Sequence, residues 1–163
     1  MHTIDILTGP IQSGKTTHLI SWIKYHSNCA GILAPVVENQ RQFYSIHNGV
    51  FHPFEAKNDS ESEQELITIG KNQFLSASIL WARSQLQLAM ELKPHWLIID
   101  EIGPIEIRGE GLEPQIGKIL DEYQRSRKNR LIIVVRENLV DQVIKHYRIE
   151  NDCKVHEAFL DII

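Results

Sequence analysis

Short apolar runs and longer segments with helical spacing alternate along this chain. The continuous apolar run at 96–99 is typical of a central parallel strand that is covered on both faces. Between residues 75 and 92, apolar side chains recur at steps of three and four, which predicts an amphipathic helix that ends before Pro94. The predicted strands are residues 4–8, 29–37, 66–74, 96–99, 131–135 and 155–160, and the predicted helices are residues 17–27, 75–92, 112–123 and 139–147. This alternation predicts an α/β fold, a doubly wound and mostly parallel sheet with helices on both faces.

A β-hairpin is inserted into this alternation. Residues 41–47 and 50–56 are joined by Asn48-Gly49, and both positions tolerate positive φ in a tight turn. The polar and acidic segment at 58–64 is expected to be an exposed loop. With 163 residues and no visible repeat or linker, the chain is expected to form a single domain, residues 1–163.

Composition and charge exclude several classes of protein. A net charge of −4 and a pI near 6.0 argue against nucleic-acid binding, and the basic cluster at 125–130 follows a predicted helix, where cations complement the helix dipole. No apolar run approaches the 18 residues or so of a membrane span. Cys29 and Cys153 form no C-x-x-C pair, which suits a reducing compartment. The eight histidines lack metal-ligand spacing, so zinc is not expected, and the chain is expected to be cytoplasmic without a membrane or nucleic-acid partner.

Residues 9–16 form a complete phosphate-binding loop of the G-x-x-x-x-G-K-[ST] type. The loop follows a predicted strand and opens a predicted helix, which is the context that the motif requires. Backbone N–H groups of such a loop surround phosphate oxygens, while Lys15 reaches the β- and γ-phosphates and the Thr16 hydroxyl can bind Mg²⁺. The predicted nucleotide-binding residues are Gly9, Pro10, Ile11, Gln12, Ser13, Gly14, Lys15, Thr16 and Thr17.

Two acids, Asp100 and Glu101, follow the apolar run at 96–99. They are expected at the carboxyl end of a central strand, the edge where doubly wound sheets bind ligands. Asp100 is expected to hold Mg²⁺ beside Thr16, directly or through a water. Glu101, one residue on, should point to the opposite side of the chain and is the candidate to orient and deprotonate an attacking water.

Phosphoryl transfer also needs neutralisation of the negative charge on the β- and γ-oxygens, beyond what Lys15 and Mg²⁺ supply. Arg136, expected at the same sheet edge as the acidic pair, is the preferred arginine, and Arg41, Arg83 and Arg108 are alternatives. Glu38, just after the second predicted strand, lies where an acceptor substrate would be met in a small phosphotransferase. No N-K-x-D segment is present to read guanine, which argues against a GTP-selective switch.

The segment 100–106, Asp-Glu-Ile-Gly-Pro-Ile-Glu, resembles the D-E-I-G-[KP]-[IML]-E-[LI] segment of the thermostable or cancer-related nucleoside triphosphatases. The resemblance extends from residue 4 to about residue 136, and it implies a RecA-like P-loop domain with slow, Mg²⁺-dependent hydrolysis of several nucleoside triphosphates. It assigns Lys15 and Thr16 to phosphate and metal, and Asp100 and Glu101 to metal and catalytic base. Glu106 matches the motif without an implied role. The chain departs from the family at Gln12, where a further glycine is usual, and at 34–38, where the family has a polar Thr-Glu-rich run.

The function expected from these observations is Mg²⁺-dependent hydrolysis of the γ-phosphate of ATP, GTP and possible further nucleoside triphosphates, with relaxed base preference. Two alternatives stay open. A nucleoside or nucleotide kinase would use the same γ-phosphate on an acceptor, with Glu38 and Arg41 near that acceptor. A nucleotide-binding adaptor would hydrolyse only incidentally, and its protein partner is not evident from the sequence.

Overall fold

The computed structural model describes residues 1–10, 14–53, 66–69 and 72–157, and within them the strands form one eight-stranded sheet and one two-stranded sheet. The strands are β1 (Ile4–Leu7), β2 (Cys29–Leu33), β3 (Val36–Val37), β4 (Gln40–Ser45), β5 (Val50–Pro53), β6 (Leu66–Ile69), β7 (Asn72–Leu75), β8 (Trp96–Ile102), β9 (Arg130–Val135) and β10 (Cys153–His156). The helices are α1 (Lys15–Ile23), α2 (Ser76–Glu91), α3 (Pro104–Ile107), α4 (Gln115–Arg125), the 3₁₀ turn η1 (Glu137–Leu139) and α5 (Val140–Tyr147).

The large sheet has the order β10-β1-β9-β8-β2-β4-β3, with β5 paired to β4. The five strands from β10 to β2 run parallel, whereas β4 is antiparallel to β2, β3 and β5. The carboxyl ends of β1, β9, β8 and β2 therefore meet at one edge, which is where an α/β sheet can form a ligand site. The predicted mostly parallel α/β sheet is confirmed.

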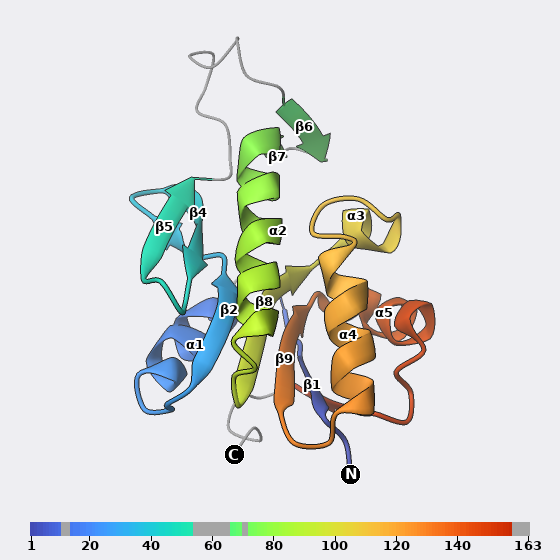
Figure 1. Ribbon diagram of the computed structural model, residues 1–163. Coiled ribbons are helices and arrows are strands. Elements are labelled where there is room, and N and C mark those ends of the chain that lie inside the picture. Colours follow the sequence, from blue (N-terminus) through green and yellow to red (C-terminus); the bar gives the residue numbers. More distant parts are fainter. Residues whose placement is uncertain (11–13, 54–65, 70–71, 158–163) are drawn as a thin grey trace.

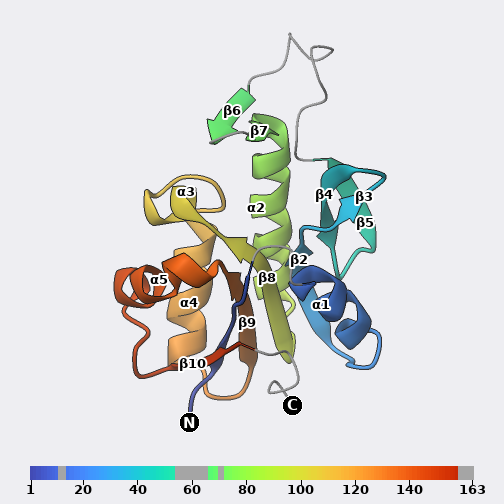
Figure 2. The ribbon, with the colours of Figure 1, turned by 180° about the vertical axis from the view of Figure 1, so that it is seen from behind.

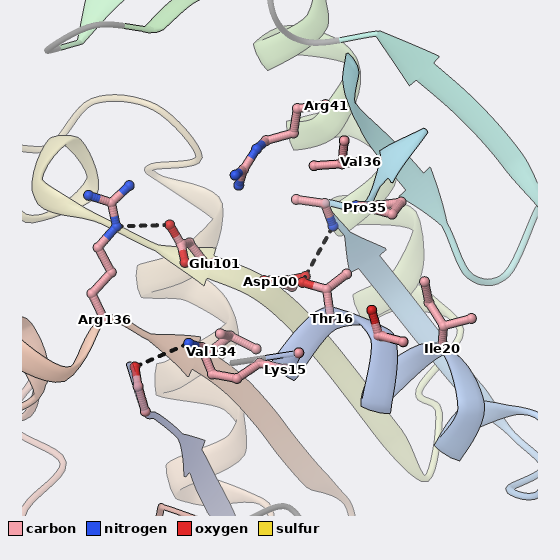
Figure 3. Close-up of a pocket in the computed structure, with 14 residues that line it drawn as sticks. Lys15, Thr16, Ile20, Pro35, Val36, Arg41, Asp100, Glu101, Val134 and Arg136 are labelled. Atoms are coloured by element: carbon pink, nitrogen blue, oxygen red, sulfur yellow. Dashed lines mark hydrogen bonds and ion pairs between the residues drawn. The ribbon is translucent and has the colours of Figure 1, made fainter. Parts of the chain in front are cut away.

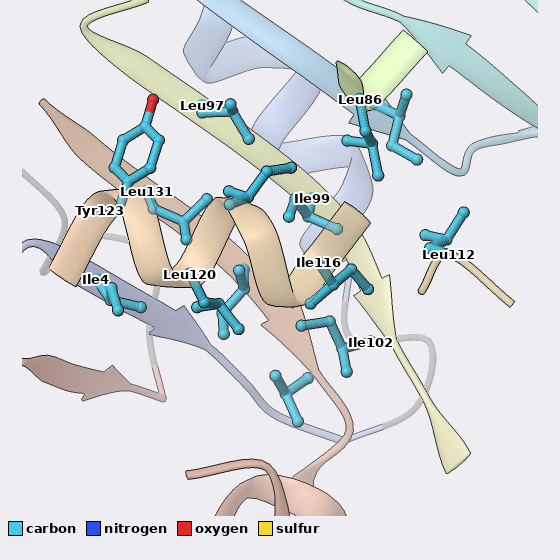
Figure 4. Close-up of a cluster of buried hydrophobic side chains, with 14 of the residues drawn as sticks. Ile4, Leu86, Leu97, Ile99, Ile102, Leu112, Ile116, Leu120, Tyr123 and Leu131 are labelled. Atoms are coloured by element: carbon cyan, nitrogen blue, oxygen red, sulfur yellow. The ribbon is translucent and has the colours of Figure 1, made fainter. Parts of the chain in front are cut away.

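Helices cover both faces of the sheet, as predicted. α2 and α4 lie in front of the strands in Figure 1, and α1 lies in front of them in the opposite view of Figure 2. The larger hydrophobic cluster joins α2, α4 and α5 to one face (Figure 4), and the smaller one joins Leu19 of α1 to the other. β8 contributes alternately to the two clusters, Leu97 and Ile99 to the larger and Ile98 to the smaller. This explains why its sequence is a continuous apolar run.

The hairpin expected around Asn48-Gly49 is confirmed as β4 and β5. It extends the large sheet through the pairing of β4 with β2. Polar contacts hold it to α2, because Ser45 Oγ and Asn48 Nδ2 both donate to Gln85 Oε1, at 3.0 and 2.5 Å. The hairpin is thereby fixed beside the carboxyl end of β2.

The single strand predicted at 29–37 is wrong. β2 ends at Leu33, and after Ala34 and Pro35 the chain forms β3, which pairs with β4 and not with β8. Proline lacks the N–H that a central strand needs. Glu38 and Asn39 then have φ of 50° and 62°, the conformation of a tight two-residue hairpin turn.

Other boundaries also differ from the predictions. The segment 66–74 is two antiparallel strands, β6 and β7, because alternating polarity does not distinguish one strand from two joined by a turn. The helix predicted at 112–123 begins later, at Gln115, after a separate short helix α3. The strand predicted at 155–160 is β10, and residues 158–160 lie outside the described residues, as does the loop predicted at 58–64. Among the described helices, none is long and apolar enough to span a bilayer.

We expect Gly31→Ala to destabilise the fold strongly. Gly31 in β2 has φ of +125°, and a Cβ there would overlap the carbonyl oxygen of Ile98 in β8. Backbone strain and overpacking together should lower the free energy of unfolding by about 2–5 kcal/mol, measured by urea denaturation. Gly109→Ala is the matched control, because Gly109 also has positive φ (+83°) but its Cβ would meet nothing within 4 Å. An equal effect of the two substitutions would contradict the argument from close packing.

Candidate active site

The phosphate-binding loop joins β1 to α1 at the carboxyl edge of the sheet. α1 begins at Lys15, directly after Gly14, whose φ of +82° is a left-handed conformation that glycine adopts without strain. Lys15 Nζ donates to the carbonyl oxygens of Gly9 and Pro10, at 3.2 and 3.0 Å, so the ammonium lies over the start of the loop. Ile11, Gln12 and Ser13, three of the predicted nucleotide-binding residues, lie outside the described residues.

Asp100 lies beside Thr16, as predicted. Its Oδ2 accepts hydrogen bonds from Thr16 Oγ1 at 2.7 Å and from the Ala34 N–H at 3.2 Å. β1, which precedes the phosphate loop, and β8, which carries Asp100, are separated in the sheet by β9. The contact forms because the first turn of α1, which contains Thr16, lies beside the end of β8 (Figure 3).

Glu101 does not point away from Asp100, as simple strand alternation predicted. Asp100 pairs with Val134 and Ile102 with Val135, so Glu101 is an extra residue that forms a β-bulge in β8. A bulge redirects the side chains around it. As a result both acids line the same cleft. Glu101 Oε1 accepts a hydrogen bond from Arg136 Nε at 3.1 Å, and the two side chains are 24% and 42% exposed.

The cleft has a volume of about 530 Å³ and combines the predicted residues from four parts of the chain. It is lined by Gly9, Gly14, Lys15, Thr16, Thr17, Ile20, Ala34, Pro35, Val36, Arg41, Asp100, Glu101, Val134 and Arg136. Of the arginine candidates, Arg136 and Arg41 approach Glu101 from two sides (Figure 3). Arg83 instead donates from Nε to the Gly111 carbonyl at 2.6 Å, and neither it nor Arg108 is among the lining residues.

Several lining residues were not found from the sequence. Ala34 binds Asp100 through its backbone, and Pro35, Val36 and Ile20 form an apolar wall beside Thr16. Their side chains carry no chemical signal. The only available signal was position, since residue 34 follows the carboxyl end of a strand that could be expected near the site. Glu38, by contrast, lies in the turn between β3 and β4 and does not line the cleft.

Burial and charge act in opposite directions on Asp100. Burial raises the pKa of this carboxyl, whereas the hydrogen bonds from Thr16 and Ala34 lower it. The negative charge of Glu101 raises the pKa further, and the positive charge of Arg41 lowers it. The cleft as a whole contains two carboxylates and three positively charged side chains, those of Lys15, Arg41 and Arg136. This excess of positive charge favours a polyanionic ligand.

The oxygen atoms beside the phosphate loop fit a magnesium ion. A carboxylate and a hydroxyl are hard oxygen ligands, and Mg²⁺ is usually held by one or two protein groups together with phosphate and water. Asp100 and Thr16 supply such a pair. Within the described ranges, no group of three or more His, Cys, Asp or Glu side chains suggests a different, all-protein metal centre.

A family model described as NTPase matches residues 5–160, which includes both the phosphate loop and the acidic pair. The chain belongs to this NTPase family. The resemblance drawn from segment 100–106 is therefore confirmed, and the cleft is the candidate active site of an NTPase. No curated protein sequence matches the chain.

Two solved structures share the fold of this NTPase. THEP1 from the hyperthermophile Aquifex aeolicus aligns with a TM-score of 0.72 and 17% identity, over 94% of this chain and 88% of that one. A human cancer-related nucleoside triphosphatase aligns with a TM-score of 0.64 and 16% identity, over 99% of this chain and 90% of that one. Because the identity is so low, these two similarities show a shared fold and nothing about substrate.

We expect Lys15→Ala to abolish turnover and weaken triphosphate binding without unfolding this NTPase. The substitution removes charge-assisted hydrogen bonds to phosphate, so the Kd measured by calorimetry should rise by about 10- to 100-fold. Lys24→Ala is the control, because Lys24 is exposed at the far end of the same helix. Unchanged triphosphate affinity in Lys15→Ala would show that the loop does not bind phosphate as assigned.

Proposed function

We propose that this NTPase hydrolyses the γ-phosphate of Mg²⁺-bound nucleoside triphosphates, including ATP and GTP, with relaxed base preference. The observation that carries the proposal is the convergence of Lys15, the Thr16–Asp100 pair and Glu101 in one cleft. Together they offer a phosphate cation, oxygen ligands for a metal, and a carboxylate with access to water. These are the parts that phosphoryl transfer to water requires.

Glu101 is proposed as the general base. A water oxygen attacks the γ-phosphorus in line, the bond to the β–γ bridging oxygen breaks, and Glu101 takes the proton released by the water. The products are a nucleoside diphosphate and inorganic phosphate. The ion pair with Arg136 supports this role, because it holds the side chain in the cleft while leaving 24% of it exposed.

Positive charge for the transition state is assigned to Lys15 and Arg136, with Arg41 on the opposite side of Glu101 (Figure 3). Thr16 and Asp100 would hold Mg²⁺, which would neutralise charge on the β- and γ-oxygens. The described lining side chains that form hydrogen bonds all have phosphate, metal or catalytic assignments or belong to the loop itself. Among these residues none is left to read a base edge, which supports relaxed base preference.

The kinase alternative has weaker support. An acceptor would need to lie against the apolar wall of Pro35 and Val36, near Arg41. Glu38, the acid expected to serve such an acceptor, is in the β3–β4 turn and not in the cleft lining. We therefore favour water as the acceptor.

We expect Glu101→Gln to separate binding from chemistry. The variant keeps the side-chain shape but loses the base, so single-turnover hydrolysis should fall by about 10²–10⁴-fold while nucleotide affinity holds or rises slightly. Glu38→Gln should leave hydrolysis unchanged. If Glu101→Gln hydrolyses at the wild-type rate, water is activated elsewhere. If Glu38→Gln is the more damaging change, and only with an acceptor present, the kinase alternative is correct.

We expect Arg136→Ala to reduce kcat more than Arg41→Ala does. Arg136 contacts the proposed base directly, and loss of one group that stabilises transition-state charge lowers kcat by about 10²–10³-fold. The measurement is steady-state phosphate release at saturating nucleotide and Mg²⁺. A larger kcat loss in Arg41→Ala would transfer the transition-state role to Arg41.

A further inference from the structure

Glu106 is a buried carboxylate outside the cleft. Glu106 is only 5% exposed. It lies in α3, which begins at Pro104, shortly after β8 ends at Ile102. Oε2 accepts a hydrogen bond from the Gly103 N–H at 2.9 Å, and Oε1 accepts one from the Leu112 N–H at 3.4 Å. One carboxylate thus joins two segments that are nine residues apart.

These two segments frame the end of the strand that carries the acidic pair. Gly103 lies two residues beyond Glu101, immediately after the bulged part of β8. Leu112 lies in the loop between α3 and α4, and the neighbouring Gly111 carbonyl accepts a hydrogen bond from Arg83 of α2. The tie through Glu106 therefore connects the end of β8 to a loop that is itself anchored on a long helix.

We propose that Glu106 is a positioning residue for Glu101. Its carboxylate fixes the Gly103 peptide, and with it the direction in which the bulged strand presents Glu101 to the cleft. This inference rests on the proposed function, because it assumes that Glu101 acts on the water.

A helix cap alone would not require this arrangement. Capping α3 needs only the Gly103 N–H, and a neutral side chain can accept that bond. Two N–H donors on the two oxygens match an ionised carboxylate, which has acceptor sites on both, whereas a protonated carboxyl uses one oxygen as a donor. The second bond, to Leu112, is the one that links the strand end to the anchored loop.

The surroundings of Glu106 act in opposite directions on its charge. Burial raises the pKa of Glu106 from 4.5 to about 7, the hydrogen bonds from Gly103 and Leu112 oppose this, and the charge of Glu101 adds to it. From α5, Tyr147 faces the same region and has a raised pKa, caused mainly by burial and by its hydrogen bond with Glu113, with a further contribution from Glu106. From α2, Arg83 approaches the same loop and donates a hydrogen bond to the Gly111 carbonyl.

The raised pKa has opposite consequences for stability and for turnover. Because the folded-state pKa exceeds the unfolded value, the stability contributed by the protonated form is complete below about pH 4.5 and is lost as the pH rises through about 7. The positioning role needs the ionised form, so kcat should increase as the pH rises through about 7. A purely structural carboxylate would change stability with pH but not kcat.

The test compares Glu106→Gln with Glu110→Gln, a control in the same loop whose side chain is exposed. Since a small misplacement of a catalytic group can cost about 10²-fold, we expect Glu106→Gln to lower kcat by about 10- to 100-fold with KM changed by less than about threefold. Its kcat should also lose the rise near pH 7 that wild type and Glu110→Gln retain. Its melting temperature relative to wild type should increase from pH 5 to pH 8, because the variant has no charge to bury.

For the variants, the inference is overturned by a kcat and pH profile of Glu106→Gln equal to those of Glu110→Gln, or by a lowered melting temperature with unchanged kcat. Wild-type protein supplies a second measurement if Glu106→Gln does not fold. The amide proton shifts of Gly103 and Leu112, followed by NMR, should titrate together near pH 7, and failure of both to titrate also overturns the inference. Glu101→Gln, assayed in parallel, keeps the two proposals distinct. Wild-type hydrolysis by Glu101→Gln removes the proposed base, whereas an inactive Glu101→Gln beside a fully active Glu106→Gln removes only the role of Glu106.

Discussion

The site depends on one buried carboxylate, that of Asp100, which binds three parts of the chain at one point. Its Oδ2 accepts from the Thr16 hydroxyl on α1 and from the Ala34 N–H at the end of β2, while Asp100 itself belongs to β8. Burial disfavours its charge, so these hydrogen bonds are needed to offset the loss of hydration. This shared acceptor fixes the relative positions of the phosphate loop, the apolar wall and the acidic strand.

A second constraint is the bulge at Glu101. In a regular strand, consecutive acids would lie on opposite faces of the sheet, and one of them would be directed into a hydrophobic cluster. The extra residue in β8 places both carboxylates in the cleft. Two acids this close repel one another, and the pKa of Asp100 is raised partly by Glu101. Arg136, paired with Glu101, and Arg41, near Asp100, compensate for that repulsion from opposite sides.

The same balance extends behind the cleft. Burial raises the pKa of Glu106, and its carboxyl oxygens accept hydrogen bonds from backbone N–H groups at the strand end and in the following loop. Functional sites commonly retain such unfavourable groups because geometry, and not stability, is what they maintain. The chain thus has three carboxylates on or close to β8 that differ in burial and in partners: a proposed metal ligand, a proposed base and a proposed positioning group.

The sequence by itself determined the elements with strong local signals: the phosphate loop, the buried strand at 96–99 with its two acids, the hairpin at Asn48-Gly49 and the segment 100–106 that indicated the family. Each depends on residue types whose chemistry or periodicity is visible without neighbours. Tertiary structure alone decided that Pro35 ends β2 and sends Glu38 into a turn, that a bulge brings Glu101 to the same side as Asp100, and that Arg41 reaches the cleft while Arg83 binds a carbonyl elsewhere. These outcomes follow from strand pairing and from competition among distant donors and acceptors, because a local pattern does not specify which partner a strand edge or a guanidinium will meet.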